Sequence, residues 1–207
     1  MTDQTQQHVE RAMELLDAVG AVDVEHPSGT LAEHLRGTYD VLASWACPEH
    51  VRLAGLYHSV YGTEVFRTQT IALDARDRVR ETIGDSAEQL AFLYCALRRS
   101  SLYENLDRGA PYSIEDRDGG RIALDGIEQF AELLTLDVAN RLEQIDRTPS
   151  SATQRARDRE IYERAAPLLP APAVSALRAA LPKMSKPELL ARKALRPVRR
   201  AIRRVKR

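Results

Sequence analysis

The sequence predicts an all-α protein, a helical bundle with one small β-hairpin. Aromatic residues make up only 5% of the chain, and glycine and proline number ten each, which disfavours a strand-rich sandwich. Long stretches instead repeat apolar residues at helical spacing. No apolar run approaches the ~20 residues that span a bilayer, and the first residues lack a secretory-signal pattern. Cys47 and Cys95 form neither a disulfide framework nor a C-x-x-C motif, so we expect a cytoplasmic protein.

The first three expected helices are marked by local signals. Residues 4–19 form an amphipathic pattern that Gly20 ends. Thr30 and Glu33 have the spacing of a capping box and predict the start of a second helix. Pro48 suits the first turn of a third helix, because a proline there lacks only an N–H group that would be unpaired anyway.

The middle of the chain predicts two further helices and the hairpin. Residues 74–83 form a short helix, and Asp85 with Glu88 is predicted to cap the next one. Residues 112–124 then break the helical pattern. The glycine-containing turn 118–120 between two short apolar segments predicts a β-hairpin there.

The last third predicts two more helices and a separate extension. Asp125 with Glu128 is expected to cap a strongly apolar helix, and residues 151–169 read as a final charged helix. Several prolines follow. We therefore expect a helical domain over residues 1–169 and a proline-punctuated basic extension over residues 170–207.

The net charge of zero conceals a strong asymmetry. Residues 183–207 hold eleven Lys and Arg against one acidic residue, Glu188, whereas residues 1–182 hold 19 basic and 29 acidic residues. The basic segment is faintly amphipathic. Such a segment is suited to an anionic membrane surface or to nucleic-acid phosphates, so we expect either a peripheral membrane contact or a nucleic-acid contact. A solvated tail is the alternative.

Two histidines are the main chemical signal. His34 and His58 each fall on the apolar stripe of a predicted helix, and the two helices are consecutive. Imidazole is the commonest metal ligand, and ligands that converge from separate rigid elements suit a divalent ion. The alternative is that each is a core histidine bonded to a backbone group or a carboxylate.

The spacing His34-x23-His58 and the run Leu53–Ser59 resemble the HD-domain metal phosphohydrolases. Within that superfamily the chain is most similar to the hydrolase half of the guanosine-polyphosphate (stringent-response) enzymes, over roughly residues 26–146. The supporting segments are Ser28-Gly29, Arg78–Asp85 and Ala139–Leu142. The run Ala54–Thr63 resembles a group of small, uncharacterised HD-like proteins. This resemblance implies a divalent metal (Mn, Fe or Zn) and a phosphorylated small molecule or nucleotide as substrate.

The chain departs from the HD pattern at the acidic positions. The His-Asp doublet is His58-Ser59 here, the late metal aspartate corresponds to Asn140, and the Glu-Asp pair falls on Gly62-Thr63. Two residues could restore the ligand set. Asp137 lies one turn before Asn140 and would complete a 2-His-1-carboxylate set suited to Fe(II), whereas His26 would complete a three-histidine set suited to zinc.

His58, Ser59 and Glu64 are the candidate catalytic residues. Ser59 cannot pair directly with His58 as a nucleophile, because adjacent helical residues point about 100° apart. Glu64 follows the second histidine, where it would line a polar pocket or cap the helix end.

Three functions fit these residues. The first is an HD-like metal-binding protein that hydrolyses a phosphorylated small molecule. The second is a non-catalytic HD-like module that binds a small ligand or a partner. The third is a non-haem iron oxygenase on the same scaffold.

Overall fold

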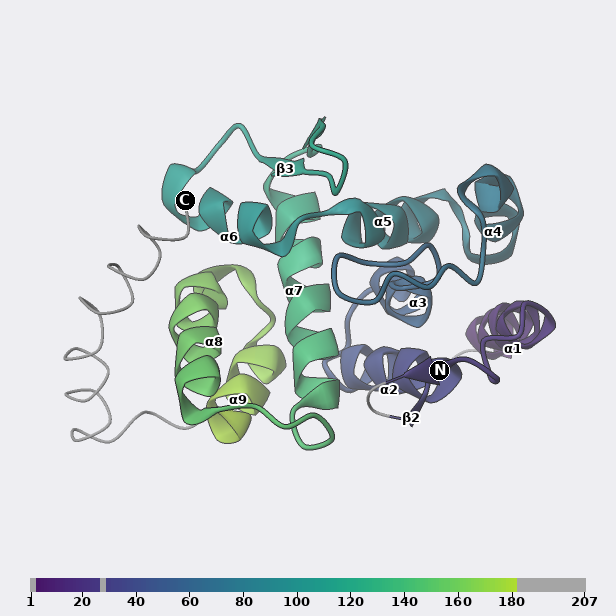
Figure 1. Cartoon of the computed structure of the whole chain (residues 1–207), viewed down its shortest axis with the longest axis horizontal. Helices are drawn as coiled ribbons and strands as arrows, with labels where there is room; N and C mark the ends of the chain where they lie inside the picture. The colour runs from purple at the N-terminus through teal and green to yellow at the C-terminus, as the bar shows by residue number, and fades with distance from the viewer. Residues whose placement is uncertain (1–2, 27–28, 182–207) are drawn as a thin grey trace, which may run out of the picture.

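The computed structural model describes residues 3–26 and 29–181, and these residues are predominantly helical (Figure 1). The α-helices are α1 (Asp3–Ala18), α2 (Leu31–Ser44), α3 (Glu49–Tyr57), α4 (Arg76–Ile83), α5 (Asp85–Ala96), α6 (Arg99–Arg108), α7 (Ile127–Gln144), α8 (Ala152–Ala165) and α9 (Ala171–Ala180). The short elements are the 3-10 helices η1 (Leu73–Ala75) and η2 (Ala166–Leu168) and the strands β1 (Glu25–His26), β2 (Gly29–Thr30), β3 (Ser113–Glu115) and β4 (Arg121–Ala123). The predicted all-α class with a small hairpin is confirmed.

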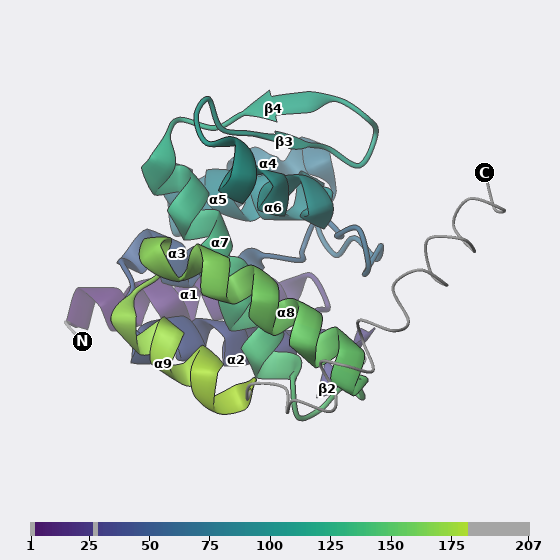
Figure 2. The same cartoon turned by 90° about the vertical axis from the view of Figure 1, so that its left-hand side faces the viewer.

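Helix α7 runs through the centre of the molecule. In Figure 1, α2, α3 and α5 lie on one side of it and α8 and α9 on the other, and the contacts between elements agree. Figure 2 shows α8 and α9 side by side in front of the bundle. Because α7 is surrounded, polar residues on it are buried together with its leucines, and Asp137 and Asn140 are 1% and 7% exposed. This central position makes α7 the main supplier of buried polar groups.

Two local signals are confirmed in detail. The Thr30 hydroxyl accepts a hydrogen bond from the Glu33 N–H (3.2 Å), and the Glu33 carboxylate accepts one from the Thr30 N–H (2.9 Å), which is a complete capping box. Strands β3 and β4 pair antiparallel with Ser113 opposite Ala123. The capping box places the start of α2, and with it His34 one turn later.

The other predicted caps are wrong. Pro48 is the N-cap residue of α3, one position before its first turn. Helices α5 and α7 begin after Gly84 and Gly126, and neither has a side-chain cap. Both glycines adopt positive φ, +85° and +139°, a backbone conformation that aspartate avoids. Glu88 is instead fully buried and forms ion pairs with arginines of α4.

Two helices were not expected. Helix α6 lies in a stretch with no predicted element, and α9 lies within the predicted extension. The charged helix predicted over 151–169 is α8 followed by η2. Helix α9 packs against α7 and buries Ala173 and Leu177, so the packed body continues past residue 169 to Leu181. The basic segment 183–207 lies outside the described residues. Within the described ranges, no helix has the length and apolarity needed to cross a membrane.

Candidate functional site

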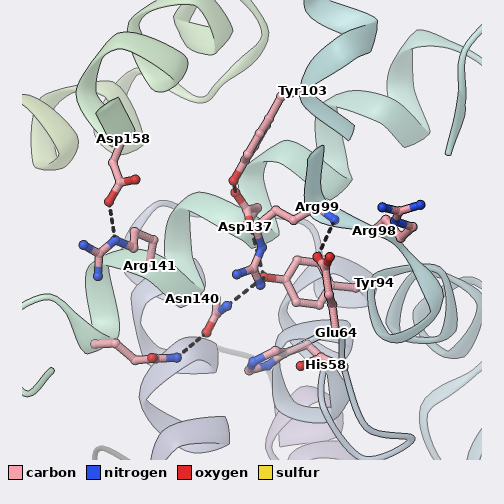
Figure 3. Close-up of polar contacts among 12 residues, drawn as sticks. His58, Glu64, Tyr94, Arg98, Arg99, Tyr103, Asp137, Asn140, Arg141 and Asp158 are labelled. Atoms are coloured by element: carbon pink, nitrogen blue, oxygen red, sulfur yellow. Dashed lines mark hydrogen bonds and ion pairs between the residues drawn. The ribbon is translucent and has the colours of Figure 1, made fainter. Parts of the chain in front are cut away.

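One cavity of about 640 Å³ gathers the residues singled out from the sequence. It lies beside α7, with the N-terminal part of α8 and the loop before it forming one wall. Its lining includes all of the predicted site residues: His26, His34, His58, Ser59, Glu64, Asp137 and Asn140. The volume falls in the range of ordinary small-molecule sites. Figure 3 shows the polar contacts around this cavity.

The two predicted histidines meet each other. The Nε2 atoms of His34 and His58 are 3.0 Å apart, and both residues are 1% exposed. His34 lies on α2, and His58 is the C-cap residue of α3, so the tight packing of these helices brings the rings together. Gly55 permits that packing, because a Cβ atom there would lie 2.4 Å from Leu42 Cδ1.

The second nitrogen of each imidazole has its own partner. His58 Nδ1 donates to the Gly55 carbonyl oxygen (2.7 Å), so its Nε2 carries a lone pair. His34 Nδ1 lies 2.5 Å from Glu143 Oε2 on α7. When Glu143 is ionised, His34 Nδ1 is the donor and His34 Nε2 also carries a lone pair. Two lone pairs then face one another in a buried place.

Burial keeps both imidazoles uncharged. Desolvation, with the neighbouring His26 and Arg147, lowers the pKa of His34 to about 3. Desolvation and the adjacent His34 ring lower the pKa of His58 well below its ordinary value. The pKa of Glu143 is raised by burial. Both histidines are therefore neutral near pH 7 and act as hydrogen-bond acceptors or metal ligands.

These shifts predict a loss of stability on mild acidification of the metal-free protein. The unfolded chain protonates its histidines near pH 6.5, while the folded chain resists protonation to much lower pH. Stability is therefore fully present above pH 6.5 and falls as the pH is lowered towards 3. Each imidazole contributes about 1.4 kcal/mol per pH unit in this window. We expect the free energy of unfolding, measured with urea, to fall by roughly 2–3 kcal/mol from pH 7.5 to pH 5.5.

A double variant tests whether the two buried imidazoles cause this pH dependence of stability. His34→Gln combined with His58→Gln should remove most of the difference between the two pH values. His50→Gln should preserve it, because His50 is a partly exposed surface residue paired with Glu132. Glu143 opposes the effect, since its raised pKa favours the folded state on acidification. Equal stability of the wild type at both pH values would contradict the assignment.

Asp137 is held in a separate buried cluster. Its carboxylate accepts hydrogen bonds from the hydroxyls of Tyr94 (3.0 Å), Tyr103 (2.6 Å) and Tyr162 (3.0 Å), and it pairs with Arg99 (2.9 Å). These partners come from α5, α6 and α8, so the cluster ties three helices to α7. With both oxygens engaged, Asp137 is a structural anion and is not directed at the imidazole pair.

The remaining predicted residues have distinct places. The His26 ring stacks on His34, with centroids 4.2 Å apart and planes within 6°. Asn140 donates to the Tyr94 hydroxyl (2.7 Å) and accepts from Gln144 (2.8 Å). Glu64 accepts from the Arg99 backbone N–H (2.9 Å; Figure 3). Ser59 is 2% exposed, and its hydroxyl lines the cavity.

Neither of the three-ligand metal sets is assembled. Within residues 3–26 and 29–181, no three His, Cys, Asp or Glu side chains are grouped so as to hold one ion. His26 is not placed as a third ligand, because its ring is stacked on the His34 ring and presents its face to that ring. Asp137 is not placed as a third ligand either, because its carboxylate is bonded to the tyrosine hydroxyls. The donors beside the imidazole pair are side-chain amides, since Gln144 Nε2 lies 3.3 Å from His34 Nε2.

Sequence reasoning missed Glu143, Gln144 and Arg141. A usable signal existed, because Asp137, Asn140, Arg141 and Gln144 recur at helical spacing within an otherwise apolar helix. Such a polar stripe on a central helix predicts a buried polar site. Tyr103 carried no comparable signal, since α6 itself was not expected.

Comparison with known proteins adds one match. Residues 15–99 match the model of a domain of unknown function (DUF6817). That segment runs from the end of α1 through α5, so it includes both histidines of the pair but not α7 or α8. No curated protein and no solved structure matches the chain.

Proposed function

We propose that this chain is an HD-like protein that binds a divalent metal ion at His34 and His58 and hydrolyses a phosphorylated small molecule in the adjoining cavity. The observation that carries the proposal is the 3.0 Å approach of the two Nε2 atoms, each on a ring whose Nδ1 is already engaged. Metal-bound histidines characteristically donate their second ring N–H to a carboxylate or a carbonyl. Glu143 and the Gly55 carbonyl occupy these two positions.

The facing lone pairs argue for a bound cation. Two lone pairs at this separation repel each other unless a proton, a metal ion or a hydrogen-bond donor engages them, and the Gln144 side-chain amide lies 3.3 Å from His34 Nε2. A shared proton is disfavoured near neutral pH, because burial lowers the pKa of both histidines. His34 and His58 are the residues that would hold the ion through these two nitrogens. The competing arrangement is a neutral proton chain in which Glu143 keeps its proton and His34 donates to His58.

The donor set favours a nitrogen-preferring ion. Mg²⁺ and Ca²⁺ require oxygen ligands, largely carboxylates, whereas imidazole suits zinc, iron and other later transition metals. Asn140 and Gln144 offer only neutral amide groups at the pair. Zinc or Fe(II) therefore fits better than manganese. The iron-oxygenase alternative loses support, because it needs a carboxylate at the imidazoles and Asp137 is engaged elsewhere.

The residues of the cavity suit hydrolysis of a bound small molecule. A bound metal ion would polarise a phosphoryl oxygen and lower the pKa of a coordinated water. The chain itself supplies a site in which the imidazoles are shielded from bulk solvent and Glu143 fixes the orientation of His34. Ser59 offers a hydroxyl next to His58 for hydrogen bonding to the ligand.

Elemental analysis and titration of protein purified without a metal-affinity tag test this proposal. We expect about one equivalent of zinc or iron, lost in His58→Ala and retained in the surface variant His50→Ala. Loaded wild type should then hydrolyse members of a panel of phosphate esters. If metal-free wild type takes up no zinc, iron or manganese, the proposal is wrong, and the non-catalytic ligand-binding alternative is favoured.

A further inference from the structure

The cavity contains polar atoms that the imidazole pair leaves unused. Among the residues that the structure describes, four buried side-chain atoms without a hydrogen-bond partner belong to residues that line it: Ser59 Oγ, Arg99 Nε, Arg141 Nη2 and Thr148 Oγ1. Arg99 Nε is ion-paired with Asp137, which leaves the other three. Ser59 is almost fully buried, with 2% of its surface exposed. Buried polar groups without a partner are rare and costly in native structures. Their concentration in one cavity indicates that a ligand supplies the missing partners.

Arg141 restricts the chemistry of that ligand. Its Nε donates to Asp158 Oδ2 (2.7 Å), and Asp158 Oδ1 accepts from Gln154 Nε2 (2.7 Å; Figure 3 shows the first contact). This clamp holds the guanidinium in place and leaves Nη2 without a partner. A guanidinium can only donate hydrogen bonds, so the atom that faces Nη2 must be an acceptor. Thr148 lines the same cavity, and its hydroxyl can also donate a hydrogen bond to an acceptor there.

The surrounding charge also favours an anion. Ser150, the N-cap residue Ser151 and Gln154 in the first turn of α8 line the cavity, and a helix N-terminus attracts negative charge. Arg157 is exposed on the same wall, and it forms no ion pair with any described residue. The buried acidic residues of the lining, Asp137 and Asp158, are already neutralised by Arg99 and Arg141. In the buried part of the lining, an incoming anion therefore meets unpaired donors. The lining also contains the exposed carboxylate of Glu64, which accepts from the Arg99 backbone N–H (2.9 Å).

We propose that Arg141, Thr148 and the N-terminal turn of α8 form a phosphate subsite that anchors the phosphorylated ligand. The subsite is a second anchoring point, separate from the imidazole pair, and Ser59 faces the part of the ligand next to that pair. This inference rests on the proposed function for the identity of the ligand. It requires no metal, so the two proposals fail independently.

Binding of inorganic phosphate to the full-length, metal-free protein tests the subsite by calorimetry. We expect Arg141→Gln to weaken phosphate binding roughly 10–100-fold, because a charge-assisted hydrogen bond is lost. Thr148→Val should weaken it about 2–10-fold, since it removes one neutral donor and keeps the shape of the side chain. Arg178→Gln is the matched control. Arg178 lies on α9, outside the cavity, and it also pairs with a carboxylate, that of Glu163.

The outcomes separate clearly. Unchanged phosphate affinity in both Arg141→Gln and Thr148→Val would overturn the subsite. So would the absence of phosphate binding by the wild type, or binding of chloride or acetate as strong as that of phosphate at the same ionic strength. If Arg141→Gln does not fold, Thr148→Val alone decides the question. His58→Ala should retain phosphate binding and lose metal, whereas Arg141→Gln should retain metal. Phosphate binding without metal uptake would support the subsite and refute the metal-dependent hydrolase.

Discussion

Replacing Asp137 with alanine is expected to lower the free energy of unfolding by about 3–5 kcal/mol, because it removes one partner of a buried ion pair. The substitution leaves the guanidinium of Arg99 without its carboxylate and three tyrosine hydroxyls without their acceptor. For a chain of this size, the melting temperature should fall by roughly 6–20 °C. Urea denaturation and thermal melting followed by circular dichroism measure both quantities.

Asp107→Ala is the control for this prediction. Asp107 also pairs with an arginine, Arg164, but its side chain is 77% exposed. A surface ion pair of this kind contributes only about 0–1 kcal/mol. If Asp137→Ala proves as stable as Asp107→Ala, the tyrosine cluster does not hold α6 and α8 against α7, and its proposed structural role is wrong.

Replacing Glu143 with glutamine is expected to weaken zinc binding roughly 10–100-fold, as loss of a carboxylate behind a metal-bound histidine typically does. When it is ionised, the Glu143 carboxylate accepts from His34 Nδ1 and thereby directs the Nε2 lone pair towards His58. The Glu143 side chain is 3% exposed and is also paired with Arg147. Competition titration against a chromophoric chelator measures the change in affinity.

The chain offers a closely matched control on the same helix. Glu132 also contacts a histidine, His50, at 2.7 Å, but that pair is partly exposed and lies outside the cavity. Glu132→Gln should leave zinc affinity unchanged. Equal zinc affinity in Glu143→Gln and wild type would show that Glu143 does not set the protonation of His34. The proposal that the Glu143 carboxylate orients a metal-bound His34 would then be wrong.

The helices that the sequence missed show where local patterns are weak. Helix α9 has proline at its N-cap, Pro170, and a second proline, Pro172, in its first turn. Prolines in these positions cost no intrahelical hydrogen bond, so residues read as breakers are compatible with a helix start. Helix α6 has no side-chain cap and few buried residues, so its periodic signal is faint. Both helices are stabilised by packing against α7 and α8 rather than by their own sequence.

The sequence by itself determined the features that depend on neighbours within a few residues. The capping box at Thr30 and Glu33, the β3–β4 hairpin and the inward orientation of His34 and His58 all follow from spacing of two to four residues. These features establish a helical protein with two buried histidines.

Only the tertiary structure decided which groups meet. Glu143 reaches His34 across 109 residues, and Asp137 is enclosed by tyrosines from three other helices. The sequence indicated Asp137 as a candidate ligand, because it is a carboxylate one turn from Asn140, and did not single out Glu143. Long-range partners depend on how helices pack and on which groups are buried together. Local periodicity in the sequence predicts neither of these. The packing around α7 therefore assigned Asp137 to stability and left Glu143 to orient the imidazole pair.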